Sequence, residues 1–146
     1  MDPTTVISIM SGSLGLAVKV GTVVNDLYKL SMRFKYAQLT LESIASECEM
    51  VQAAWEGIEA WAKKQPTEPD EGRQRLLDRL SKSLLFGTMV FGKLEEDLKE
   101  FLAEPQNLGF FRRTKLVWNE DCFAQHQNRI RGQVTALTLL LQVIDL

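Results

Sequence analysis

Two long stretches of the sequence place apolar side chains at alternating spacings of three and four residues, and this repeat is the strongest constraint on the fold. Side chains at these spacings line one side of an α-helix, as in the heptads of packed helices. The first repeat comprises Leu41, Ile44, Cys48, Val51, Trp55, Ile58 and Ala62, and the second comprises Leu77, Leu80, Leu84, Gly87, Phe91, Leu94, Leu98 and Phe101. Each predicts a helical seam of about 36 Å at 1.5 Å per residue. The proline-containing segment 65–72 between them predicts a turn between two antiparallel helices that are neighbours in the bundle.

The rest of the chain fits the same helical pattern. We expect a first helix over residues 4–30, helices over residues 35–64 and 70–103, and a break at residues 104–109. Asn119 followed by two acidic residues is typical of a helix N-cap, after which the apolar spacing continues to Ile144. The sequence therefore predicts an all-α fold, an antiparallel bundle of four to five long helices, as one domain over residues 1–146. Because the chain ends within an apolar run, we expect further protein after Leu146.

The composition excludes several classes of function. A formal net charge of -2 provides no general attraction to nucleic acid. Cys48 and Cys122 lie far apart and predict reduced thiols rather than a disulfide or a zinc motif. The one histidine, His126, lies in a polar segment, and we expect it to be partly exposed with local hydrogen bonds. No phosphate loop, zinc-protease motif or nucleophile elbow occurs, so we expect no enzyme activity, no metal and no cofactor.

The opening segment, residues 3–26, is apolar around most of a helix. No charged residue occurs from Pro3 to Val18. The apolar residues cover about two thirds of the helix circumference, whereas a helix on the surface of a domain needs an apolar arc of only roughly 100°. Ser8, Gly12, Gly15 and Lys19 fall on one narrow line at spacings of four, three and four. Small residues on such a line let another helix approach closely, as between membrane helices. A helix buried in a tight bundle needs the same small seam, and we favour that interpretation for the resting protein.

A second group of candidate residues follows the predicted break. Aromatic side chains stand beside cations at Phe110, Phe111, Arg112, Arg113 and Lys115. This combination could bind lipid headgroups, because each cation near an anionic membrane contributes about 1 kcal/mol. The alternative, which we favour, is the start of a helix packed by the two phenylalanines.

Two blocks of the sequence resemble a known family. They are MDPTTVISIMSGSLGLAVKV at residues 1–20 and KLVWNEDCFAQHQNRIRGQVTALTLLLQVI at residues 115–144. Together with the long acidic helix between them, they resemble the HeLo-like N-terminal domains of fungal NLR-type (STAND) proteins. The resemblance implies a helical effector domain that acts in programmed cell death, innate immunity or heterokaryon incompatibility. It implies partners in the downstream domains of the same chain, in other copies of the chain and in membrane lipids, and a cytoplasmic domain that moves to the plasma membrane on activation.

In this family the first helix is thought to be released on oligomerisation and to enter the membrane. Carried over to this sequence, the resemblance assigns lipid insertion to Val6, Ile7, Ile9, Met10, Leu14, Leu16, Val18 and Val20. Residues 6–18 would span about 20 Å as a helix, less than the roughly 30 Å of a hydrocarbon core, so several first helices would have to assemble. The alternative from another class is a helical interaction or oligomerisation module that regulates downstream domains and never touches lipid.

Overall fold

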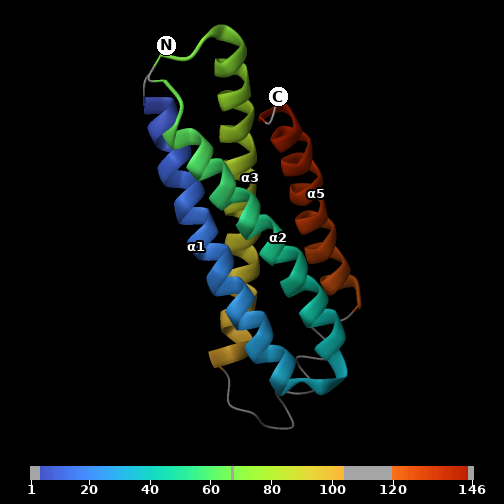
Figure 1. Cartoon of the computed structure of the whole chain (residues 1–146). Coiled ribbons are helices and arrows are strands. Elements are labelled where there is room, and N and C mark those ends of the chain that lie inside the picture. Colours follow the sequence, from blue (N-terminus) through green and yellow to red (C-terminus); the bar gives the residue numbers. More distant parts are fainter. Residues whose placement is uncertain (1–3, 67, 104–119, 145–146) are drawn as a thin grey trace.

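The computed structural model describes residues 4–66, 68–103 and 120–144 and shows long helices throughout (Figure 1). The elements are α1 (Thr4–Arg33), a short 3-10 helix η1 (Lys35–Ala37), α2 (Gln38–Lys63), α3 (Glu71–Ala103) and α5 (Glu120–Ile144). No strand occurs within these residues. The predicted all-α helical bundle is confirmed.

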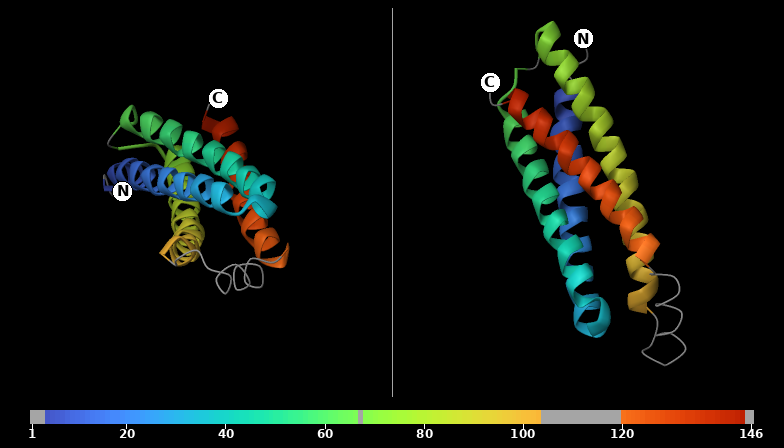
Figure 2. Two further views of the ribbon diagram at one scale, coloured as in Figure 1. Left: turned by 90° about the horizontal axis from the view of Figure 1, so that it is seen from below. Right: turned by 90° about the vertical axis from the view of Figure 1, so that its right-hand side faces the viewer.

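Each helix runs antiparallel to the next along the chain, so that α1 and α3 are parallel to each other (Figures 1 and 2). The main contacts join α1 to α2, α1 to α3, α2 to α5 and α3 to α5. The helices therefore lie around the bundle in the order α1, α2, α5, α3. In this order α1 and α5 occupy opposite corners, and so do α2 and α3. The prediction that α2 and α3 are neighbours was wrong, because α1 and α5 lie between them on either side.

The two predicted seams form most of the core. Every residue of the first seam is buried, including Trp55 in the middle of α2. The second seam is also buried, except that Leu84 is only partly covered. From α5, Ile130 and Leu137 reach the same core. The repeat of three and four thus located the inner faces of α2 and α3 correctly.

Helix ends differ slightly from the expectation. Helix α1 continues to Arg33. The side chain of the next residue, Phe34, is buried, and its backbone amide donates a hydrogen bond to the Leu30 carbonyl oxygen at 2.8 Å. Asp70 caps the start of α3, because its Oδ1 accepts a hydrogen bond from the backbone amide of Arg73 at 2.8 Å. The predicted break at residues 104–109 and the cap at Asn119 lie outside the described residues.

Candidate functional site

The eight apolar residues of α1 that were assigned to lipid insertion divide between two faces. Val6, Ile9, Leu16 and Val20 are buried in the bundle and Met10 is half-buried. The other three point to solvent, with exposed fractions of 56% for Ile7, 52% for Leu14 and 64% for Val18. These three recur at spacings of seven and four, so they share one outer face of α1. The helix is apolar on both its inner and its outer side.

Helix α1 is also long enough to cross a membrane. Residues Thr5–Arg33 contain an 18-residue window of mean hydropathy 1.6, and 39% of that window is buried. The core helix of a soluble protein can have the same length and composition. The exposed side chains of Ile7, Leu14 and Val18 are therefore the informative part, since burial in this bundle does not account for them.

The line of small and polar residues on α1, Ser8, Gly12, Gly15 and Lys19, is also divided between residues that face α3 and residues that face solvent. Gly12 lies against α3, where the Leu84 side chain fills the space that a Cβ would need. Lys19 is half-buried and its Nζ lies 3.9 Å from the Cβ position of Gly92. Ser8 and Gly15 are exposed, and nothing lies within 4 Å of a Cβ built at Gly15. Gly12 thus serves the close approach of α1 to α3, whereas Gly15 serves no contact inside the bundle.

The polar contacts that hold α1 come from its second half. The buried Asp26 carboxylate lies 3.4 Å from Lys99 Nζ of α3. The Tyr28 hydroxyl donates to Glu49 of α2 at 3.0 Å, and this hydrogen bond raises the pKa of Tyr28. Arg33 donates to the backbone carbonyl of Leu102 at 3.5 Å. Among the described residues, apolar packing alone joins the first half of α1 to its neighbours.

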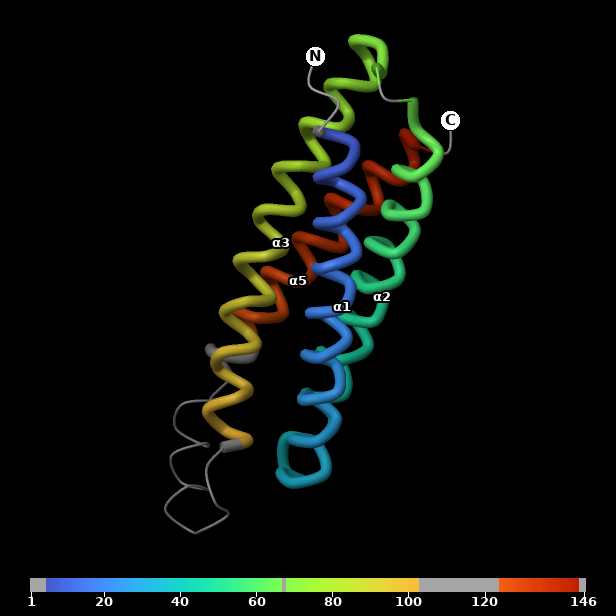
Figure 3. Tube along the Cα trace, turned by 90° about the vertical axis from the view of Figure 1, so that its left-hand side faces the viewer, coloured from blue at the N-terminus to red at the C-terminus, as the bar shows by residue number. Residues whose placement is uncertain are grey.

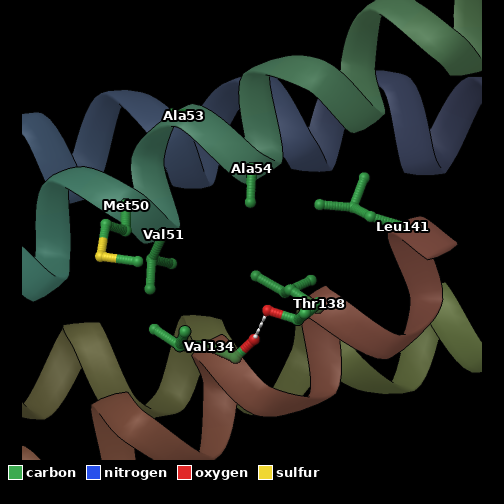
Figure 4. Close-up of a pocket in the computed structure, with 8 residues that line it drawn as sticks. Met50, Val51, Ala53, Ala54, Val134, Thr138 and Leu141 are labelled. Carbon is green, nitrogen blue, oxygen red and sulfur yellow. Dashed lines mark hydrogen bonds between the residues drawn. The ribbon is translucent and has the colours of Figure 1, made fainter.

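A second candidate site is an open groove between α2 and α5 (Figure 4). It has a volume of about 310 Å³. Its lining comprises Met50, Val51, Ala53, Ala54, Val134, Leu137, Thr138 and Leu141. The hydroxyl of Thr138 donates to the Val134 carbonyl oxygen at 2.7 Å, so it is already satisfied within α5. The groove therefore presents methyl and methylene groups and suits an apolar side chain or helix face rather than a polar substrate.

The buried polar centre of the bundle was missed by the sequence analysis. Gln133 of α5 accepts a hydrogen bond from Trp55 Nε1 at 3.3 Å and donates to Ser83 Oγ at 3.2 Å. Its Oε1 occupies the space in which a Cβ at Gly87 would stand. The available signal in the sequence was Gln133 itself, a polar residue next to the apolar positions of α5. The arrangement is fully hydrogen-bonded and structural.

His126 corrects an expectation. Its side chain is buried rather than partly exposed, and its Nε2 lies 3.1 Å from Asp97 Oδ2 of α3, so its partner is distant in sequence. The earlier interpretation was wrong because position 126 lies one turn before Ile130 and shares its inward face. Burial lowers the pKa of His126, and Asp97 only partly offsets this effect.

Neither a reactive thiol nor a metal site is found within the described residues. Burial raises the pKa of the Cys48 thiol to about 12, so it is protonated and not a nucleophile. Within the ranges that the structure describes, no three His, Cys, Asp or Glu side chains lie close enough to hold a metal ion. Phe110, Phe111, Arg112, Arg113 and Lys115, the proposed headgroup patch, lie outside these ranges.

The comparisons with known proteins add no assignment. The sequence matches no protein-family model and no curated protein, and the structure matches no solved structure.

Proposed function

We propose that this chain is a membrane-active effector domain, which self-assembles and inserts α1 into a lipid bilayer. The observation that carries the proposal is the outer face of α1, where Ile7, Leu14 and Val18 are exposed on a helix that already buries its inner face. Single exposed apolar residues are ordinary. Three on one face, without a charge between residues 3 and 18, indicate a second apolar environment for the same helix.

The buried face of α1 sets the energetic condition for insertion. Release would expose Ile9, Leu16, Val20, Val23, Leu27 and Leu30, which are all buried. At about 1.5–3 kcal/mol for each side chain, the cost is on the order of 10 kcal/mol. The isolated bundle therefore keeps α1 in place. Only an environment that covers both faces of the helix, such as lipid together with other copies of α1, offsets this cost.

The length of α1 suits this role. Its 30 residues extend about 45 Å, more than the roughly 30 Å of the hydrocarbon core. Lys19 is the one charge among residues 5–24, and its long side chain could reach a headgroup or a water-filled lumen. In an assembly, Ser8, Gly12 and Gly15 would allow neighbouring helices to approach closely. The resemblance to HeLo-like domains implies cell death as the outcome and the plasma membrane as the target.

Leakage of dye from anionic lipid vesicles tests the proposal. Leu14→Glu and Val18→Glu should leave helicity and melting temperature nearly unchanged, because both side chains are exposed, and should abolish leakage, because a charge on this face opposes burial in lipid. Leu39→Glu on α2 is the matched control, since Leu39 is 83% exposed and lies on another helix. A wild-type protein that leaves vesicles intact, or a Leu14→Glu variant that leaks like wild type, would contradict the proposal.

The groove between α2 and α5 supports a second candidate function. Its apolar lining could accept a helix face of another protein or domain, as expected for an interaction module. Such a module would leave vesicles intact. The leakage assay therefore separates the two functions.

A further inference from the structure

Helix α3 exposes large apolar side chains beside α1. Leu85 and Met89 are each 65% exposed in the middle of the helix. Two residues of α3 approach α1: Gly92 lies near Lys19, and Lys99 pairs with Asp26. Leu85 precedes Gly92 by seven residues and Lys99 by fourteen, so it shares their face and lies on the α1 side of α3.

The apolar side chains of the two helices lie at the same height. Gly12 packs against Leu84, and Leu16 Cδ2 lies 2.9 Å from the Cβ position of Gly87, so Leu14 and Val18 are level with Leu85 and Met89. Figure 3 shows the two helices side by side along this face. We call the surface formed by Ile7, Leu14, Val18, Leu85 and Met89 the α1–α3 patch.

Cations stand beside this patch. Arg75 and Lys82 are exposed on α3 fourteen and seven residues before Met89, so they share its face of the helix. No ion pair joins either of them to a carboxylate in the part of the chain that the structure describes. The nearby Asp78 accepts a hydrogen bond from Gln74. The first half of α3, residues 71–89, has four basic residues against two acidic ones, and the other acidic residues of α3 follow at Glu95, Glu96, Asp97 and Glu100. Helix α2 is acidic, with Glu42, Glu47, Glu49, Glu56 and Glu59 against one basic residue, Lys63. The charge distribution would orient the bundle with the first half of α3 toward a negative surface and α2 away from it.

We propose that the folded bundle docks on an anionic lipid surface through the α1–α3 patch, with Arg75 and Lys82 facing the headgroups, before α1 leaves its place. This inference rests on the proposed function and assigns its first step to the intact fold. Apolar side chains next to cations are the combination that peripheral membrane binding requires. A second copy of the chain fits less well, because it would present the same two cations to the same face.

Flotation of the intact protein with vesicles tests docking separately from leakage. The probes are phosphatidylcholine vesicles with and without phosphatidylserine. The double variant Leu85→Glu/Met89→Glu should weaken binding at least about tenfold, and it changes no residue of α1. Each of Arg75→Gln and Lys82→Gln should weaken binding to the anionic vesicles about fivefold, with little effect on neutral ones. Leu139→Glu, at a side chain of α5 that is 60% exposed, should bind like wild type.

The outcomes distinguish the two proposals. If the double variant floats like wild type while Leu14→Glu abolishes leakage, the docking surface is wrong and insertion of α1 stands. If wild type floats and the double variant does not, but no vesicles leak, docking stands and insertion fails. Light scattering provides a further check. A dimer that the double variant disrupts without any change in flotation would assign the patch to a second copy and overturn lipid docking.

Discussion

Gln133 shows how one polar residue fixes the relative position of three helices. Its side-chain amide bonds to Trp55 of α2 and to Ser83 of α3, and Gly87 leaves the space that its oxygen occupies. A buried amide that lost one partner would cost about 1–3 kcal/mol, so the network favours one register of α5 against α2 and α3. Glycine is therefore required at position 87 because any larger side chain would collide with Gln133, and not because the backbone there has an unusual conformation.

His126 makes stability depend on pH. Its pKa in the folded protein lies below the ordinary value of 6.5 because the ring is buried, so the unfolded chain binds a proton more readily than the folded one. The stabilising contribution is complete above pH 6.5 and is lost as the pH falls below this value toward the folded pKa. We expect the free energy of unfolding, measured by urea titration, to decrease between about pH 7.5 and about pH 5.

The variant His126→Gln provides the control, because glutamine keeps a polar side chain but does not titrate. Its free energy of unfolding should fall less over the same range, since His126 is the one histidine of the chain. An equal fall in wild type and variant would assign the pH dependence to carboxylates instead.

At the scale of the elements, periodicity predicted the helices but not how their faces are shared. The spacing in α2 and α3 names the buried residues because one apolar stripe meets one core. The wide apolar arc of α1 does not show which part is covered, since this depends on where α2 and α3 lie. For the same reason, the sequence alone does not predict that Ile7, Leu14 and Val18 are exposed. Nor does it predict the separation of α2 and α5 that forms the groove.

The ion pair between Lys99 and Asp26 gives a prediction about how α1 is held. Asp26 has only 6% of its side chain exposed, so Lys99→Ala leaves a buried carboxylate without its cation and should destabilise the fold by about 1–2 kcal/mol in urea unfolding. The same variant should leak vesicles faster than wild type, because α1 is held less firmly. Lys63→Ala is the control, because Lys63 is exposed and pairs with Glu59 one turn earlier in the same helix rather than with α1, and its loss should cost less than about 0.5 kcal/mol. Equal stabilities of the two variants would show that the Lys99 contact does not hold α1.

At the scale of the whole molecule, the bundle separates two kinds of surface. The first halves of α1 and α3 expose apolar side chains, and basic residues outnumber acidic ones on α3 between residues 71 and 89, whereas the acidic residues of α2 lie on another side. Their connection through Gly12 and Leu84 is close, so docking by α3 brings α1 to the same surface. Release of α1 at that surface would move its buried residues into lipid without first exposing them to water, which lowers the cost of the step.

Gly15 distinguishes the resting bundle from an assembly of first helices. It is exposed, helical and without a neighbour within 4 Å of a Cβ, so Gly15→Ala should raise the free energy of unfolding by about 0.5–1 kcal/mol. If neighbouring copies of α1 pack through this line in the membrane, the added methyl group should reduce leakage several-fold although the fold is more stable. Gly57→Ala on α2 is the matched control, because Gly57 is also exposed and helical with nothing within 4 Å. It should give the same stabilisation in urea unfolding with unchanged leakage. Equal leakage of the two variants and wild type would remove Gly15 from the contact between first helices.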